Sequence, residues 1–201
     1  MTEPANALES LAEYLRTVEV IAPHVRDCSE PPALGLLVAA GPRAEGAEGD
    51  YGLLFEAIRE GFLLHYGEPR LIAGADPDLC LLAGDYLYAL GLEKLAERGD
   101  VAAVRELGDL ISLSAQVQAR GGEDAAEVTA ALWLASAVAV GTGVDDEHER
   151  AKRALREGAP DAASALAAGA AAAAAEEGMD GALAGAAESI GFASNHLFDR
   201  G

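Results

Sequence analysis

Residues 76–92 read DPDLCLLAGDYLYALGL, and this stretch decides the fold class. Asp76 stands where a helix N-cap is favoured, and Pro77 fits a first helical turn, where the amide proton that proline lacks has no partner to lose. The apolar residues that follow recur at the spacing of a helix and give it a wide apolar surface. These residues are Leu79, Leu81, Leu82, Ala83, Tyr86, Leu87 and Leu90. The stretch therefore predicts one long helix packed against others.

Helical spacing continues on both sides of this stretch. Gly99-Asp100 ends the helix and caps the next one over 101–120, Gly121-Gly122 ends that one, and the last helix is expected to end near Phe198. No segment alternates with period two for long enough to predict a strand. We expect an all-α fold, a compact bundle of eight or nine helices. It forms a single domain over 1–201, with N-terminal helices and a loop in 1–50, a core in 51–156 and alanine-rich helices in 157–201.

The composition excludes several classes of function. Asp and Glu number 34 against 14 Lys and Arg, which gives a formal net charge of -20. No basic patch is available for a phosphate backbone or an anionic lipid surface, so we expect neither nucleic-acid binding nor membrane docking. The longest uncharged runs, 128–144 and 162–175, are interpreted as buried helices, so no membrane insertion is expected. The first residues lack the pattern of a secretion signal, which favours a cytoplasmic protein.

Three segments, in order, resemble one enzyme family. Leu79–Leu92 resembles the VLAGDYLLARA helix of trans-isoprenyl diphosphate synthases, the polyprenyl synthetase family. Residues 93–115 keep the pattern that follows it there, a helix end, a Gly-Asp break and a further helix. Val128–Trp133, VTAALW, resembles the family's G-K-T-A-A-L-F segment. The resemblance covers roughly residues 50–156 and implies an isoprenoid-synthase-like helical fold.

The resemblance also implies a chemistry. Enzymes of this family are usually dimers that bind an allylic diphosphate through magnesium held by two aspartate-rich motifs, and they extend it with isopentenyl diphosphate. Carboxylates facing inward from two helices hold the magnesium ions, which stabilise the departing diphosphate. A working enzyme of this kind would therefore need both acidic motifs.

This chain departs from the family's pattern where the catalytic residues belong. Aligning Gly67 on the family's conserved glycine places Glu56, Ala57 and Glu60 on the three aspartates of the first motif, with Arg59 between them. The second motif has no counterpart, since the alanine run Ala162–Ala175 occupies its place. We therefore expect a non-catalytic relative, in which Glu56 and Glu60 are at most a relic of the metal site.

A second acidic group has a tempting spacing. Asp145, Asp146 and Glu149 form a D-D-x-x-E pattern, which makes them weak metal candidates together with Glu56 and Glu60. Bases follow at the other end of the same segment, and acids at a helix start with bases at its end complement the helix dipole. We interpret the pattern as a capped, solvated helix, and magnesium is expected only if the protein is an enzyme.

Two further polar residues are relic candidates of the former active site. Asp85 lies in an apolar helix, so we expect a buried carboxylate paired with an arginine or a helix terminus. Gln116 aligns with a glutamine of the family's cavity and is expected to face either that former cavity or solvent.

Three hypotheses of function remain open. The first is a non-catalytic binding or regulatory subunit of isoprenoid biosynthesis, either a homodimer or a heteromer with a full-length polyprenyl synthase, with an apolar isoprenoid as a further ligand. The second is a residual magnesium-dependent prenyltransferase, which requires Glu56 and Asp145 to converge. The third is an unrelated alanine-rich helical protein–protein interaction module. A central cavity favours the first two, and a solid core favours the third.

Overall fold

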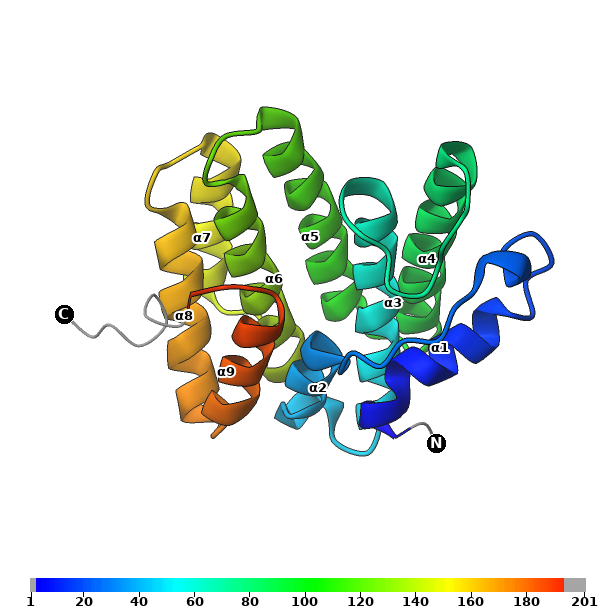
Figure 1. Ribbon diagram of the computed structural model, residues 1–201. Helices are drawn as coiled ribbons and strands as arrows, with labels where there is room; N and C mark the ends of the chain where they lie inside the picture. Colours follow the sequence, from blue (N-terminus) through cyan, green and yellow to red (C-terminus); the bar gives the residue numbers. More distant parts are fainter. Residues whose placement is uncertain (1–2, 194–201) are drawn as a thin grey trace.

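A computed structural model describes residues 3–193, which fold into nine α-helices with no β-strand in this range (Figure 1). The helices are α1 (Ala7–Leu15), α2 (Ala33–Ala39), α3 (Glu48–Tyr66), α4 (Pro77–Glu97), α5 (Val101–Arg120), α6 (Ala125–Thr142), α7 (Asp146–Glu157), α8 (Ala162–Glu176) and α9 (Asp180–Ser189). Short 3₁₀ helices span Pro4–Asn6, Ala22–His24 and Pro42–Ala44. The prediction of an all-α bundle is confirmed.

The α6 helix is the centre of the larger hydrophobic core. It packs against α2, α5 and α8, and Trp133 near its middle is fully buried. The Trp133 ring lies edge-on to Phe55 of α3, with 5.7 Å between the ring centroids. Figure 1 places α7, α8 and α9 on one side and α1, α3 and α4 on the other, with α2 between the two groups. This core is filled with side chains, which is the arrangement that the third hypothesis expects.

Among the residues that the structure describes, α6 is the one helix long and apolar enough to cross a membrane. Within the fold, however, 67% of it is buried by other helices. A helix at the centre of a packed core has the same length and composition as a membrane span, so α6 is weak evidence for one. Its burial agrees with the interpretation of residues 128–144 as a core helix.

Two glycines explain why the 76–92 stretch packs so closely on its neighbour. A Cβ atom added to Gly84 of α4 would lie 2.6 Å from the His65 ring of α3. One added to Gly61 of α3 would lie 2.9 Å from the Tyr88 ring and 3.0 Å from the carbonyl oxygen of Gly84. The missing side chains therefore let the axes of α3 and α4 approach each other, as ridges-into-grooves packing allows for small residues.

A second hydrophobic cluster lies beside the larger core, under α1. Leu8, Leu11 and Leu15 of α1 are buried against Leu71 and Leu87, from the loop before α4 and from α4 itself.

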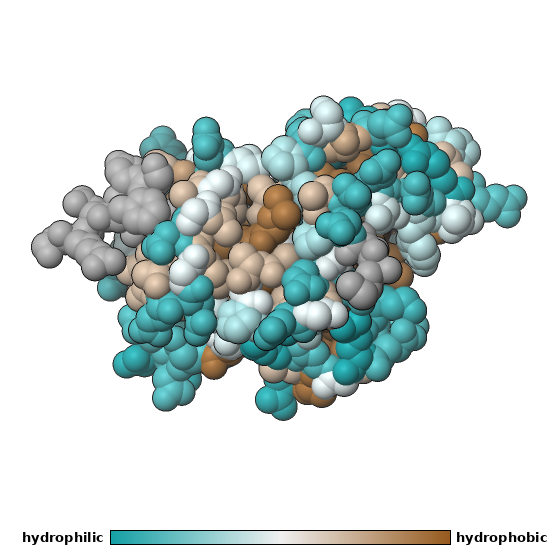
Figure 2. All heavy atoms as spheres, turned by 90° about the horizontal axis from the view of Figure 1, so that it is seen from below, coloured by the Kyte–Doolittle hydropathy of each residue, from teal (hydrophilic) through white to brown (hydrophobic). Residues whose placement is uncertain are grey.

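Figure 2, which views the molecule from below, shows apolar residues gathered between hydrophilic rims in the region of α2 and α9. The alanine-rich helices α8 and α9 also bury apolar side chains in the larger core, among them Leu166 and Leu183.

The sequence signals for helix starts are confirmed. The Asp76 side chain accepts a hydrogen bond from the Leu79 amide at 2.8 Å, and that of Asp100 accepts one from the Ala103 amide at 3.0 Å. In each case the side chain satisfies an amide that the first helical turn leaves unpaired. Pro77 is the first residue of α4, as the 76–92 stretch predicts.

Some boundaries differ from the prediction. The α3 helix begins at Glu48, within the segment 1–50 rather than at the predicted start of the core at 51, because Glu48 and Asp50 place negative charge in its first turn, where the helix dipole favours it. The α9 helix spans Asp180–Ser189. The predicted end near Phe198 lies outside the described residues.

Candidate functional site

Two glutamates lie one turn apart on α3, in the position that the resemblance gives to the first metal-binding motif. Glu56 and Glu60 are both fully buried, with 0% of each residue exposed. The α3 helix packs against α1, α2 and α4, which cover most of its circumference. Because a buried charge is costly unless it is paired, these carboxylates need partners inside the protein.

Arg70, from the loop between α3 and α4, is the main partner. Its Nη2 atom lies 2.8 Å from Glu56 Oε2, and its Nε atom donates to Glu60 Oε2 at 3.1 Å. Backbone amides bind the other two oxygens: Gly35 donates to Glu56 Oε1 and Leu71 donates to Glu60 Oε1, both at 2.7 Å. Three of the four carboxylate oxygens therefore accept a hydrogen bond from the protein itself, and the fourth, Glu56 Oε2, is held by its ion pair with Arg70.

Arg59 completes a group of two acids and two bases, called here the α3 cluster: Glu56, Arg59, Glu60 and Arg70. The Arg59 guanidinium lies over the rings of Phe62 and Trp133, 5.1 and 4.8 Å from their centroids. Burial lowers the pKa of Arg59 to about 10, and repulsion by Arg70 acts in the same direction. Burial acts against the charge of Arg70 too, but the carboxylates of Glu56 and Glu60 outweigh it and raise the pKa of Arg70.

The formal charges of the α3 cluster cancel, which changes what its acids can do. A magnesium ion needs oxygen ligands with free lone pairs arranged at near-octahedral angles. Here a guanidinium and two amides hold the carboxylates, and the positive charge of Arg70 lies where a cation would have to approach. The chemistry available to the α3 cluster is that of a buried ion pair that fixes the 67–76 loop against α2 and α3.

The second acidic group lies elsewhere, at the start of α7. Asp145 caps this helix by accepting a hydrogen bond from the His148 amide at 2.7 Å, and Asp146 lies in the first turn. Glu149 lies 2.9 Å from the Lys152 ammonium. The structure does not bring these acids together with those of α3, and residues 3–193 contain no group of three or more His, Cys, Asp or Glu side chains placed to hold a metal ion.

The expected burial of Asp85 is wrong. Its side chain is 75% exposed, and its partner is a histidine rather than an arginine, with Oδ1 lying 3.2 Å from His65 Nε2. The apolar neighbours of Asp85 are misleading because the outer face of α4 is itself partly apolar: Leu81 and Leu82 are 50% and 60% exposed. Asp85 is therefore a surface residue that holds the His65 ring.

Gln116 lies on the partly exposed side of α5. Its Nε2 atom donates to Ser112 Oγ at 3.2 Å, one turn earlier in the same helix. Gln116 was expected to face either the former cavity or solvent, and this exposed contact favours solvent.

Sequence reasoning missed a second buried group of charges, called here the α5–α7 cluster: Glu106, Asp109, Ser136, His148 and Lys152. Glu106 is 1% exposed, and its carboxylate is bound by Ser136 Oγ at 2.7 Å, His148 Nε2 at 2.8 Å and Lys152 Nζ at 2.6 Å. Lys152 Nζ also donates to Asp109 at 3.0 Å. The cluster joins three helices, α5, α6 and α7, through one carboxylate.

Both ends of the main ion pair in the α5–α7 cluster have shifted pKa values. Burial would raise the pKa of Glu106, but the hydrogen bond and charge of His148, together with Lys152, outweigh it and lower that pKa. Burial would lower the pKa of Lys152, but the Glu106 carboxylate outweighs it and raises that pKa to about 12. The sequence does hold a signal for this cluster, since Glu106 falls within the helical stripe that Ala103, Leu107 and Leu110 bury.

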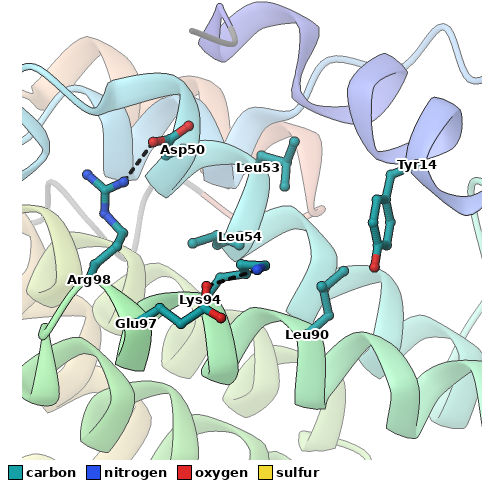
Figure 3. Close-up of a pocket in the computed structure, with 8 residues that line it drawn as sticks. All are labelled: Tyr14, Asp50, Leu53, Leu54, Leu90, Lys94, Glu97 and Arg98. Atoms are coloured by element: carbon teal, nitrogen blue, oxygen red, sulfur yellow. Dashed lines mark hydrogen bonds and ion pairs between the residues drawn. The ribbon is translucent and has the colours of Figure 1, made fainter.

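A pocket of about 380 Å³ lies between α1, α3 and α4 (Figure 3). Leu53 and Leu54 of α3 and Leu90 of α4 give it an apolar lining. The remaining lining residues are Tyr14, Asp50, Lys94, Glu97 and Arg98. Its volume falls in the range of about 300–1,000 Å³ that is typical of sites for small ligands.

The polar groups of this pocket lie toward its two ends. At one end Arg98 Nη1 lies 2.7 Å from Asp50 Oδ2, and Lys94 Nζ lies 2.9 Å from Glu97 Oε2 one turn along (Figure 3). Tyr14 lies at the other end, beside Leu90 in Figure 3. The pocket thus combines an apolar middle with polar ends, and none of the residues singled out from the sequence as a metal or catalytic candidate lines it.

Comparison with known proteins adds no relative: no family model matches the chain, and no similar curated protein or solved structure is found. The resemblance to polyprenyl synthetases therefore stays a prediction from the quoted segments.

Proposed function

We propose that the protein is a non-catalytic binding protein on a frame like that of the polyprenyl synthetases, and that it binds an apolar isoprenoid chain in the pocket between α1, α3 and α4. The observation that carries this proposal is the leucine-lined pocket of about 380 Å³ against α4. That helix contains Leu79–Leu92, the segment with the strongest resemblance to the family.

The contacts within the α3 cluster support the proposal that the protein is non-catalytic. Ionisation of an allylic diphosphate relies on carboxylates that present free oxygens to magnesium. Glu56 and Glu60 instead direct their oxygens at Arg70 and at the amides of Gly35 and Leu71. The hypothesis of a residual magnesium-dependent prenyltransferase gains no support from this geometry, nor from the separate location of Asp145.

The apolar lining of the pocket supports the proposal that its ligand is an isoprenoid chain. A chain of branched hydrocarbon units gains free energy from the apolar area that it removes from water, about 25 cal/mol per Å². Leu53, Leu54 and Leu90 offer such a surface, while the charged groups stay at one end, paired with each other. An apolar chain can therefore lie along the pocket without breaking an ion pair.

Calorimetric titration tests this proposal with two soluble probes of the same chain length, geraniol and geranyl diphosphate, in buffer containing EDTA. We expect at least one probe to bind one site per chain. Leu53→Trp fills the pocket and should weaken that binding about tenfold or more, a change of about 1.4 kcal/mol or more in binding free energy. Leu81→Trp is the matched control, because Leu81 is exposed on α4 away from the pocket.

Loss of binding in both tryptophan variants, or binding of neither probe to the unaltered protein, would contradict the proposal. A second assay tests catalysis: the protein is mixed with geranyl diphosphate, isopentenyl diphosphate and magnesium. The expected result is no longer-chain product, and turnover would contradict the non-catalytic assignment.

One observation favours a different function, a helical protein–protein interaction module. The centre of the bundle is filled around Trp133, and the exposed Leu81 and Leu82 form an apolar spot at the start of α4. Light scattering after gel filtration, of the protein alone and mixed with a full-length polyprenyl synthase, tests for a homodimer or a heteromer. Leu82→Glu should abolish an assembly that uses this spot, and an unchanged mass would remove it as the contact.

A further inference from the structure

The charges around the pocket cancel one another. Asp50, Lys94, Glu97 and Arg98 form two ion pairs along one end, Arg98 with Asp50 and Lys94 with Glu97. The end is therefore formally neutral, in a chain whose formal net charge is -20. No uncompensated positive charge lines the pocket.

A diphosphate head group fits this charge distribution poorly. It carries several negative charges, and each of its oxygens seeks a cation or a donor. To bind Lys94 and Arg98 it would have to displace Glu97 and Asp50, which would then lie next to the phosphates as like charges. Repulsion between like charges is one of the means by which a site discriminates against a ligand.

The opposite end of the pocket offers uncharged hydrogen-bonding groups. The hydroxyl of Tyr14 lies 2.6 Å from that of Tyr86 on α4, and the two rings are stacked with centroids 6.5 Å apart. One hydroxyl proton is used in this hydrogen bond, which leaves the other phenol free to donate and both oxygens able to accept. Burial, and then the hydrogen bond with Tyr14, raise the pKa of Tyr86 to about 12, so its phenol is neutral at physiological pH.

We infer that the ligand of this pocket is an uncharged isoprenoid alcohol rather than a diphosphate, with its chain on Leu53, Leu54 and Leu90 and its hydroxyl on Tyr14. This inference rests on the proposed function and adds the class of head group. A single hydroxyl matches the donor and acceptor that the tyrosine pair keeps free, and it leaves both ion pairs intact.

Titration of geraniol against geranyl diphosphate, each in EDTA, tests the head group. We expect geraniol to bind about tenfold or more tightly. Tyr14→Phe should weaken geraniol binding several-fold and leave the diphosphate unchanged. Tyr66→Phe is the control, because Tyr66 is an exposed tyrosine at the far end of α3.

A charge variant tests the reason for the discrimination. The double substitution Asp50→Asn and Glu97→Gln leaves Lys94 and Arg98 without their carboxylates, so it should tighten geranyl diphosphate binding and reduce the preference for geraniol. Equal or tighter binding of geranyl diphosphate to the unaltered protein would overturn the inference and leave the proposed function standing. Binding of neither probe would overturn both.

Discussion

Two buried clusters of charged residues in this protein use the same kinds of side chain, but their carboxylates are paired in different ways. In the α3 cluster, two glutamates share one arginine from a loop, and backbone amides take the remaining oxygens. In the α5–α7 cluster, one glutamate is shared by Ser136, His148 and Lys152 from two other helices. In the α3 cluster one base, Arg70, therefore contacts both acids, whereas in the α5–α7 cluster one acid, Glu106, is contacted by donors from two helices.

Two acids with the spacing of a metal-binding motif can thus be a structural element. The position of Glu56 and Glu60 suggested metal chemistry, yet their surroundings make them an anchor for a loop. Glu106 had no motif to draw attention to it, yet it is as deeply buried. Whether a pair of acids binds a metal or forms an internal ion pair depends on its burial and its partners, and not on its spacing in the sequence.

The largest effect is expected from removing the base that contacts both acids of the α3 cluster. Arg70→Met leaves two fully buried carboxylates without their ion-pair partner, and breaking a buried pair in this way costs about 3–5 kcal/mol. We expect a loss of this size in the free energy of unfolding, measured with urea at neutral pH. Arg98→Met is the control, because it breaks an exposed pair worth at most about 1 kcal/mol. Equal losses in the two variants would refute the role of Arg70.

The same substitution at two glycines should give effects of opposite sign. In Gly35→Ala the new Cβ would lie 2.7 Å from the Gly52 carbonyl oxygen and 2.9 Å from Glu56 Cγ, so we expect a loss of about 1–3 kcal/mol. At Gly108 of α5 nothing lies within 4 Å of the added atom, and Gly108→Ala should stabilise the helix by up to about 1 kcal/mol. Thermal unfolding of both variants gives the sign, and a stabilised Gly35→Ala would show that α2 and α3 do not approach as described.

The smallest expected effect is the change in the free energy of unfolding with pH, which we assign to the α5–α7 cluster. The pKa values of Glu106 and Asp109 are lowered by their basic partners, despite burial. A carboxyl with a lowered pKa in the folded state contributes stability above its unfolded pKa and loses it as the pH falls through the folded one. Stability should therefore decrease as the pH falls below about 5, with a slope of at most about 1.4 kcal/mol per pH unit for each proton.

At alkaline pH, stability should change with pH in the opposite direction. The pKa of Lys152 is raised from 10.5 to about 12, so its contribution is complete below 10.5 and is lost as the pH rises toward 12. Urea unfolding at a series of pH values checks both limits. In Glu106→Gln the acid slope should be shallower, and an unchanged slope would place the pH dependence elsewhere.

Helices and their caps could be predicted from the sequence because both depend on local chemistry. Asp76, Asp100 and Asp145 each bind an amide three residues ahead, which the order of residues alone indicates. The all-α class follows in the same way from the apolar spacing within each helix. The start of α3 at Glu48, which has no such cap, was not predicted from the sequence.

The partners of buried charges could not be predicted, because they come from distant parts of the chain. Arg70 reaches Glu56 only after the 67–76 loop has folded back on α3, and Lys152 reaches Glu106 only once α7 has packed on α5. Asp85 was assigned to the wrong face because exposed leucines make both faces of α4 look apolar. The pocket lies between three helices, so no sequence pattern marks it.

A crystal structure of the protein grown with magnesium and geraniol tests the central claim most directly. The account predicts the chain of geraniol between Leu53, Leu54 and Leu90, with Glu56 and Glu60 still bound to Arg70. A magnesium ion held by Glu56 and Glu60, with Arg70 displaced, or a pocket left without geraniol, would contradict it.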